Sequence, residues 1–368
     1  MPVSIRNLVV IAAIVVLPLS ASAYSLKHTL KTGTIAFGSC LKQWQPQPVW
    51  ASVTALEPQA FVFLGDNVYT DVGAYTSAEL PGRIGQAYKE LSRDKAFKRF
   101  GMQKKIDIFA TWDDHDYGVN DGGAEFPYQQ ESREYFADFF GLELDRIGDQ
   151  EKRGVFYADF RDIGGLTVQL IMLDTRSYRS PLSTGPTSSC PKNRRVPTSD
   201  PGATVLGDIQ WQWLELELKK PADLRIIASS IQVLPTEHCF EKWNNFPHER
   251  QRLFSLLNST EANGVLLISG DRHMAEISRL DGALSYPLYE ITASGLNSAL
   301  SDLAALANET NTLRTTPRNI VVDNFGTIQI TREGEEALLQ LQVRNVQGEV
   351  MEEVRLKVSD LGQLNLDK

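Results

Sequence analysis

The chain has few cysteines, no excess of basic residues and only one long apolar run. Its 368 residues include three cysteines and carry a formal charge of -9 at pH 7. This acidic balance argues against a surface that coats nucleic acid and gives no electrostatic reason to seek membranes. The excess of carboxylates suits either solubility or the collection of cations, and composition alone does not separate these two interpretations.

The one long apolar run lies at the N-terminus. Residues 8–19 follow Arg6, are too few for a comfortable membrane span, and are followed by small residues at 21–23. This pattern predicts a signal peptide at residues 1–23 and a periplasmic or secreted protein. An uncleaved membrane anchor is the alternative interpretation. Because no second run of spanning length follows, we expect no transmembrane segment after cleavage.

An odd number of cysteines in an exported protein leaves one thiol unpaired. Cys190 and Cys239 lie in loop-like stretches, and we expect them to form a disulfide that ties these loops together. Cys40 follows a predicted strand and would remain free, so binding a metal would give it a role. The alternative is a disulfide between Cys40 and one of the other two cysteines.

Short apolar runs alternate with helical or polar segments along the chain. Most of the runs are rich in β-branched residues, which predicts strands covered on both faces of a sheet. These strands are expected at 34–37, 60–64, 106–111, 166–173, 224–228 and 265–268. The helices between them are expected at 48–55, 77–98, 128–140, 207–218 and 247–258.

The C-terminal part has a different pattern of apolar and polar residues from the rest of the chain. Residues 326–331, 337–344 and 350–358 alternate between apolar and polar side chains, as is typical of antiparallel strands. They are either a small separate module or part of the same sheet system. Because no repeat, low-complexity tract or long linker precedes them, we expect one domain of mixed α/β sandwich type at residues 24–368.

Four polar clusters follow the ends of predicted strands, where open α/β sheets bind ligands. They are GSC at 38–40, GDNVY at 65–69, WDDHD at 112–116 and SGDRH at 269–273. Taken singly, Asp66 could cap a helix, Tyr69 could be a core phenol and His273 a structural histidine. Four clusters that contain Cys, Asp, Tyr and His together favour a functional site.

In this order the motifs resemble the PhoD-type alkaline phosphatases, a branch of the calcineurin-like metallophosphoesterases. The resemblance covers most of the chain, with FGSC at 37–40, FLGDNVYTD at 63–71, TWDDHDYGVND at 111–121, LDTRSYR at 173–179, WNNFPHER at 243–250 and SGDRHMAEI at 269–277. It implies an α/β fold, the metallophosphoesterase-type αββα sandwich with mixed sheets and antiparallel strands at the C-terminus. It also implies an exported hydrolase of phosphate esters.

The resemblance further implies two metal sites. The first would hold Fe(III) in a thiolate, carboxylate, phenolate and imidazole shell, which suits a trivalent ion. Its ligands would be Cys40, Asp66, Tyr69 and His273. The second site would share Asp66 and add Asp114 and Asp271, with Asn120 as a further oxygen ligand. Carboxylates favour Ca²⁺ there, with Mg²⁺ or Mn²⁺ as alternatives.

The implied reaction is an in-line attack on phosphorus by a metal-bound hydroxide. His115 matches the family's catalytic histidine and would protonate the leaving alkoxide or hold the phosphate. Arg272 would point at a phosphate oxygen, or else pair with acids at the surface. Arg176, His238 and Trp243 are assigned to substrate binding, although Arg176 could instead brace its loop.

Three functions remain open on these grounds. The first is an alkaline phosphatase or phosphodiesterase acting on small phosphorylated substrates or phosphodiesters. The second is a phospholipase-like phosphodiesterase acting on lipid or polymer substrates. The third is an exported metal-binding protein without turnover, which predicts the loss of a ligand or of His115, and neither is missing.

Overall fold

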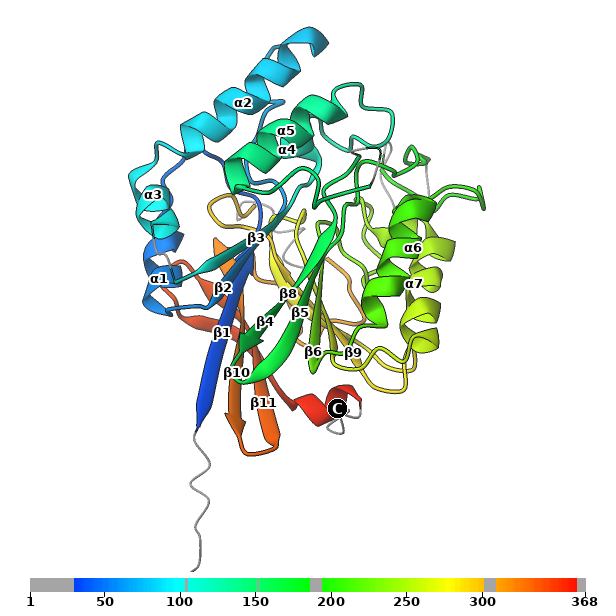
Figure 1. Ribbon diagram of the computed structural model, residues 1–368. Helices are drawn as coiled ribbons and strands as arrows, with labels where there is room; N and C mark the ends of the chain where they lie inside the picture. The colour runs from blue at the N-terminus through cyan, green and yellow to red at the C-terminus, as the bar shows by residue number, and fades with distance from the viewer. Residues whose placement is uncertain are drawn as a thin grey trace, which may run out of the picture.

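The computed structural model of the chain describes residues 30–102, 105–149, 151, 153–185, 194–300 and 309–362. Figure 1 shows two facing sheets with helices on their outer sides. The expected signal peptide at 1–23 and Cys190 lie outside the described residues, so neither the cleavage nor the disulfide is tested here. None of the described helices is long and apolar enough to cross a membrane.

The first sheet has six strands in the order β12-β11-β10-β1-β2-β3. Its members are β1 (Lys31–Gly38), β2 (Ala60–Leu64), β3 (Asp107–Thr111), β10 (Asn324–Glu333), β11 (Glu336–Asn345) and β12 (Val350–Lys357). β1, β2 and β3 run parallel to one another, and the C-terminal strands join them antiparallel through the β1–β10 pair. The three C-terminal strands therefore extend the sheet that begins with β1.

The second sheet also has six strands, in the order β4-β5-β6-β7-β9-β8. Its members are β4 (Tyr157–Ile163), β5 (Leu166–Met172), β6 (Leu224–Ser229), β7 (Val265–Ser269), β8 (Ala275–Leu280) and β9 (Leu288–Ala293). β5, β6, β7 and β9 are parallel, and antiparallel β4 and β8 close the two edges. Both sheets are therefore mixed.

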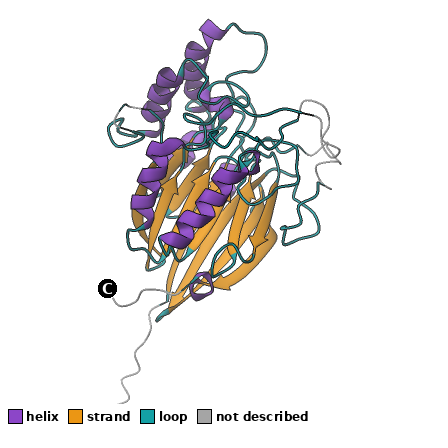
Figure 2. Ribbon diagram, turned by 90° about the vertical axis from the view of Figure 1, so that its right-hand side faces the viewer, coloured by secondary structure: helices purple, strands orange, loops and turns teal. Residues whose placement is uncertain are grey.

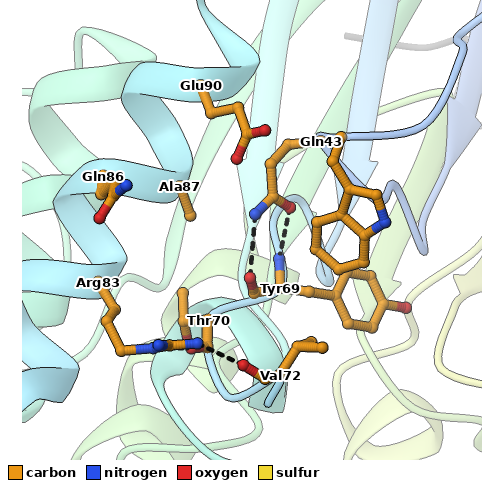
Figure 3. A pocket seen from close by; sticks show the side chains of 9 residues that line it. Gln43, Tyr69, Thr70, Val72, Arg83, Gln86, Ala87 and Glu90 are labelled. Carbon is orange, nitrogen blue, oxygen red and sulfur yellow. Dashed lines mark hydrogen bonds between the residues drawn. The ribbon is translucent and has the colours of Figure 1, made fainter. Parts of the chain in front are cut away.

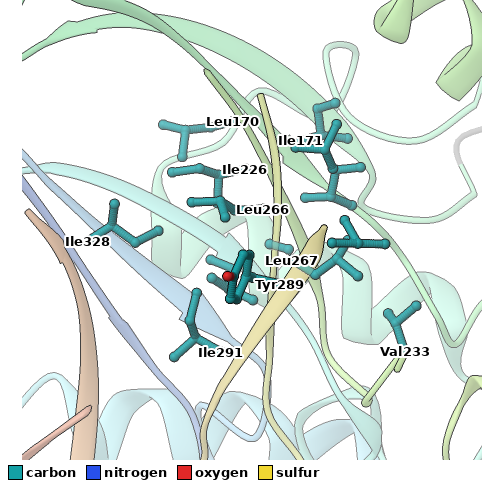
Figure 4. Packing of buried hydrophobic residues seen from close by; sticks show 14 of the residues in the cluster. Leu170, Ile171, Ile226, Val233, Leu266, Leu267, Tyr289, Ile291 and Ile328 are labelled. Atoms are coloured by element: carbon teal, nitrogen blue, oxygen red, sulfur yellow. The ribbon is translucent and has the colours of Figure 1, made fainter. Parts of the chain in front are cut away.

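Alternate side chains of each central strand enter different cores, as the two-residue period of a strand requires. Val62 of β2 belongs to the cluster between the sheets, whereas Phe61 and Phe63 belong to the cluster under the outer helices. Figure 4 shows Ile328 of the first sheet beside Ile226 and other apolar residues of the second. Strands with two buried faces explain the continuous apolar runs in the sequence.

Helices cover the outer face of each sheet. The first sheet is covered by α1 (Val49–Ala55), α2 (Leu80–Leu91), α3 (Lys95–Gly101) and α5 (Gln129–Phe140). The second is covered by α6 (Gly207–Leu218) and α7 (Pro247–Ser259), which lie in front of the strands in Figure 2. The order helix, sheet, sheet, helix confirms the predicted αββα sandwich with mixed sheets and antiparallel C-terminal strands.

One predicted helix is wrong in extent. The segment 77–98 forms the short 3-10 turn η1 (Ser77–Glu79), then α2, and then the separate helix α3. The break occurs at Asp94, whose backbone is extended and whose carboxylate accepts hydrogen bonds from the backbone N–H of Ala96 and Phe97. An N-cap of this kind starts a new helix and prevents the preceding one from continuing through it.

Candidate metal centre

The loops that follow β1, β2 and β9 meet at one edge of the sandwich. Ser39 pairs with Ser294 in an isolated parallel bridge, which links the end of β1 in the first sheet to the end of β9 in the second. The backbone N–H of Leu41 donates to the carbonyl of Asp66, at 2.9 Å. Because parallel strands share one carboxyl edge, the polar clusters that follow them are brought together there.

Four of the predicted ligands converge at this edge. Cys40 Sγ lies 3.4 Å from Asp66 Oδ2, and the Tyr69 hydroxyl donates to the same oxygen at 3.0 Å. The Tyr69 oxygen lies 3.4 Å from His273 Nε2. Single donor atoms of Cys40, Asp66 and His273 all lie within 4.8 Å of one another, close enough to share one cation. Cys40, Asp66 and Tyr69 are buried, His273 is partly buried, and Cys40 is a free thiol rather than half of a disulfide.

His273 is held in the form that a metal ligand needs. Its Nδ1 lies 2.7 Å from the backbone carbonyl oxygen of Ser298, so Nδ1 carries the proton and donates it. Nε2 is then left with its lone pair facing Tyr69. Burial also lowers the pKa of His273 to about 4, which keeps the imidazole neutral. A second hydrogen bond, from the His273 backbone N–H to Ser294 Oγ at 2.8 Å, fixes the loop.

The backbone at this edge is strained at the predicted ligands themselves. Cys40, Asp66, Asp271 and His273 all have positive φ angles, of 60°, 51°, 69° and 53°. Side chains other than glycine rarely adopt this left-handed region, and it costs free energy. Residues held in such conformations cluster at functional sites, so the strain supports a role for these four positions beyond packing.

Tyr69 is fixed from its backbone side as well. Figure 3 shows the Gln43 amide bridging the Tyr69 main chain: it donates to the carbonyl and accepts from the N–H, each at 3.0 Å. Trp44 packs its ring edge against the phenol, with centroids 6.3 Å apart. The phenol is therefore aimed at Asp66 by contacts outside the polar cluster.

A second group of possible metal ligands lies near the other carboxylate oxygen of Asp66. Asp66 Oδ1 accepts a hydrogen bond from the backbone N–H of His115 at 3.4 Å, and donor atoms of Asp66, Asp114 and His115 lie within 4.8 Å of one another. Asp114 Oδ2 accepts from the N–H of Asp121 at 2.6 Å, while its buried Oδ1 has no hydrogen-bond partner among the described residues. The two oxygens of Asp66 thus face two different donor groups.

These groups open into a cavity of about 470 Å³. Asp271 and Asn120 line it together with Asp66, Asp114 and His115. Asp271 comes directly after β7 and Gly270, whereas Asn120 follows the short helix α4 (Asp114–Tyr117) beyond β3. The structure therefore brings all the predicted ligands of the second site to one cavity, although among the described residues Asp271 is in none of the clusters of His, Cys, Asp and Glu whose donor atoms lie within 4.8 Å of one another.

His115 is charged and firmly oriented. Its Nδ1 lies 2.5 Å from Asp71 Oδ1, and its Nε2 lies 4.0 Å from Asp114 Oδ1. Burial lowers the pKa of His115, but the carboxylates of Asp114, Asp66 and Asp71 more than offset this and raise it to about 11. The imidazole therefore holds a proton beside the cavity.

Two further acids hold the loops without reaching the cavity. Asp116 accepts hydrogen bonds from the backbone N–H groups of Asp66, Asn67 and Asp113. Asp113 forms an ion pair with Arg176 and accepts from the Ser230 hydroxyl at 2.7 Å. Both carboxylates are fully buried, and these contacts explain why the WDDHD stretch is so acidic.

The residues assigned to substrate binding are not at the cavity. Arg176 is fully buried and also pairs with Glu241 at 2.7 Å, so its guanidinium braces two loops. Trp243 is fully buried and donates to Ser229 Oγ at 3.0 Å, and His238 is buried with its Nδ1 accepting from the Phe240 N–H. None of the three lines the cavity, so the structure does not place them as substrate contacts.

Arg272 does line the cavity. Its guanidinium pairs with Glu309 at 2.7 Å and lies 4.4 Å from the centroid of the Phe240 ring. It is thus held beside the cavity by a side-chain partner, and it is only 4% exposed. The pairing with an acid agrees with the alternative interpretation of Arg272, whereas its burial does not agree with a position at the surface.

Several residues of the site escaped sequence reasoning. Asp71 binds His115, Asp121 and Glu241 lie within 4.8 Å of Asp114, and Arg194 and Arg195 line the cavity. Asp71 and Asp121 are the last residues of the motifs FLGDNVYTD and TWDDHDYGVND, and this position could have predicted that they lie near the site. No comparable signal marks the two arginines, because they come from a long loop.

The chemistry of the first donor group fits a highly charged cation. Burial raises the pKa of Cys40 to about 11 and raises those of Tyr69 and Asp66 well above their usual ranges. These three acids touch one another, so they ionise together only beside strong positive charge. A metal ion supplies that charge, and thiolate, phenolate, carboxylate and imidazole are all metal ligands.

Together, the facing mixed sheets and the cluster of Cys, Asp, Tyr and His at their shared carboxyl edge define a metallophosphoesterase-type fold with a candidate metal centre. The sequence profile described as PhoD-like phosphatase matches residues 35–341, which is most of the chain. The protein therefore belongs to the PhoD-like phosphatase family, as the motifs predicted.

Two relatives agree with this assignment. Alkaline phosphatase D of Bacillus subtilis (strain 168) is 26% identical over 118 residues, which cover 30% of this chain and only 20% of that protein. A solved structure titled "Structure of PhoD" superposes with a TM-score of 0.64 at 18% identity and covers 89% of this chain and 68% of that one. At this identity the superposition shows a shared fold.

Proposed function

We propose that this protein is an exported, metal-dependent hydrolase of phosphate esters, of the alkaline phosphatase or phosphodiesterase type. The observation that carries the proposal is the position of Asp66. Its Oδ2 contacts Cys40 Sγ and the Tyr69 hydroxyl. Its Oδ1 accepts a hydrogen bond from the backbone N–H of His115, close to the Asp114 carboxylate. A carboxylate with one oxygen in each of two donor groups is suited to bridge two cations.

We assign Fe(III) to the first group, with Cys40, Asp66, Tyr69 and His273 as ligands. We assign Ca²⁺, or alternatively Mg²⁺ or Mn²⁺, to Asp66, Asp114, Asp271 and Asn120, because oxygen donors suit these ions. When bound, the two cations would acidify a water molecule and neutralise the phosphate oxygens. The left-handed backbone at four of these positions supports the assignment.

His115 is the proposed general acid. Asp71 binds its Nδ1, so the proton on Nε2 remains available to the cavity. A protonated imidazole there transfers that proton to the oxygen of the leaving group as its bond to phosphorus breaks. The raised pKa of His115 supports this role, since the group is protonated near neutral pH.

Arg272 is the proposed phosphate anchor. Its guanidinium lines the cavity and is fixed by Glu309, so it presents charge without having to be ordered on binding.

Export is proposed from the N-terminal pattern at 1–23, and residues 24–368 are proposed as one catalytic domain. The buried free thiol of Cys40 agrees with the idea that Cys190 and Cys239 form the disulfide.

Turnover of p-nitrophenyl phosphate and bis(p-nitrophenyl) phosphate by the purified, metal-loaded protein tests the proposal. We expect hydrolysis of at least one of them, and His115→Ala should lower kcat by roughly 10²–10⁴-fold while the metals stay bound. Metal binding without turnover of either ester would instead support an exported metal-binding protein.

A further inference from the structure

The cavity is lined by basic as well as acidic side chains. Arg194, Arg195 and Arg272 line it together with six carboxylates, those of Asp66, Asp114, Asp121, Glu241, Asp271 and Glu309. The proposed cations would neutralise the carboxylates that bind them, but not the arginines. An anion in the cavity would therefore gain most from an arginine that has no carboxylate partner of its own.

Two of these arginines share one aromatic ring. The guanidinium carbons of Arg194 and Arg272 each lie 4.4 Å from the centroid of Phe240. Stacking on a ring fixes the plane of a guanidinium and leaves its N–H edge free to donate to two oxygens of a phosphate. Because both guanidinium carbons lie 4.4 Å from the same ring centroid, they are at most about 9 Å from each other.

The arginines near the cavity differ in how their charge is balanced. Arg195 pairs with Asp121, Arg179 with Glu241 at 2.9 Å, and Arg272 with Glu309 at 2.7 Å. For Arg194, no carboxylate partner is found within the described part of the chain, and its described contact is the stack on Phe240. Like charges this close repel, and an anion at Arg194 would relieve that repulsion.

The side chain of Lys242 lies in the same positively charged surroundings. The Lys242 ammonium is held by the carbonyl oxygens of His238 and Phe240, on the loop that carries the ring. Burial and then the charge of Arg272 lower the pKa of Lys242 to about 8. Arg194, Arg272 and Lys242 thus lie close together around Phe240, and Arg194 is the one of these three for which no interacting carboxylate is found among the described residues.

We propose that Arg194, stacked on Phe240, binds a second phosphate on the leaving group of the substrate, while Arg272 holds the phosphate that is cleaved. The inference rests on the proposed function. It makes Arg194 a specificity-determining residue and names the substrate class as phosphate esters that carry another phosphate close to the scissile one. Because the two guanidiniums lie within about 9 Å of each other, they are close enough to bind two phosphates of one small substrate.

The test compares 3-hydroxypropyl phosphate with propane-1,3-diyl bisphosphate, which differ only in the second phosphate. The metal-loaded enzyme should hydrolyse the bisphosphate with a kcat/KM roughly 10–100-fold higher, as expected for one charge-assisted contact. Arg194→Ala should reduce this ratio to about 2, the statistical factor for two equivalent phosphates. Arg194→Lys should keep an intermediate ratio, since it keeps the charge but not the planar stack.

Arg279→Ala is the matched control. Arg279 also stacks on an aromatic ring, that of Tyr289 at 5.8 Å, and pairs with Asp281, but it does not line the cavity. Its ratio should equal that of the unmodified enzyme. Hydrolysis of both esters with a ratio unchanged by Arg194→Ala would overturn the inference and leave the proposed function standing. No hydrolysis of either would overturn both.

Discussion

Asp71 Oδ1 lies 2.5 Å from Nδ1 of His115, and the second oxygen of Asp71 accepts a hydrogen bond from the backbone N–H of Asn120 at 2.8 Å. One carboxylate thus orients the proposed acid and also holds the loop that carries a proposed metal ligand. The pairing fixes which imidazole nitrogen faces the cavity. It makes Asp71 a positioning residue for His115.

Replacing Asp71 with Asn should lower kcat by roughly 10–100-fold, because His115 loses the partner that orients it and favours its charged form. Steady-state kinetics with p-nitrophenyl phosphate measures the effect. Asp71→Asn should also lower the apparent pKa of the proton donor, which shifts the alkaline limb of the pH–rate profile to lower pH, since the removed carboxylate helps to raise the pKa of His115.

A double variant separates positioning from general damage. If Asp71 acts through His115, adding Asp71→Asn to His115→Ala should cost little further activity. Fully additive losses would contradict the role. Asp162→Asn, at an exposed position near the end of β4 where the carboxylate accepts from Gly165 N–H, is the matched control and should leave kcat unchanged.

Tyr69→Phe tests the assignment of Fe(III). A phenolate on Fe(III) gives the protein a visible charge-transfer band, and removing the Tyr69 hydroxyl should abolish it. Absorption spectroscopy of the purified protein measures the band. Tyr88→Phe is the control, because that buried hydroxyl bonds to Asp116 at 3.4 Å and belongs to no donor group, so the band should persist. A colourless and fully active enzyme would refute the phenolate ligand.

Arg176→Met should destabilise the fold instead of weakening substrate binding. Arg176 is fully buried between Asp113 and Glu241, and its loss removes the cation of Asp113 and one of the two cations of Glu241 from a buried site. Breaking a buried ion pair in this way costs about 3–5 kcal/mol of unfolding free energy. Urea unfolding followed by circular dichroism measures it.

The control for this variant is Arg161→Met. Arg161 also pairs with two carboxylates, Asp107 at 2.5 Å and Asp159 at 2.7 Å, but it is 34% exposed. Its loss should cost less than about 1 kcal/mol. If Arg176→Met left the urea midpoint unchanged and raised KM, Arg176 would be a substrate contact after all.

All six strands of the first sheet were predicted, whereas three strands of the second sheet were missed. β2 matches its predicted range because five consecutive buried residues give a strong signal. β4 and β8 were missed: they lie at the sheet edges, and most residues of β4 are only partly buried, so the apolar pattern is weak. β9 was missed although it is fully buried, since Glu290 and Thr292 interrupt its apolar run.

The candidate site shows a similar division. Cys40, Asp66 and His273 follow strong strands, so their convergence could be predicted from the parallel order of those strands. Two roles stayed open for Arg176, substrate binding and bracing of its loop, because a sequence does not reveal that Asp113 and Glu241 surround it. Arg194 was missed since it becomes part of the cavity only through the packing of a long loop against Phe240.

The central claim is that Asp66 bridges two metals, and the metal content of Asp66→Ala tests it most directly. Elemental analysis should be run on this variant, on Asp271→Ala and on the unmodified protein, all prepared in the same way. The account predicts that Asp66→Ala loses both metals and all phosphatase activity, whereas Asp271→Ala loses only the second metal. Retention of either metal at full occupancy in folded Asp66→Ala protein would contradict the bridging role.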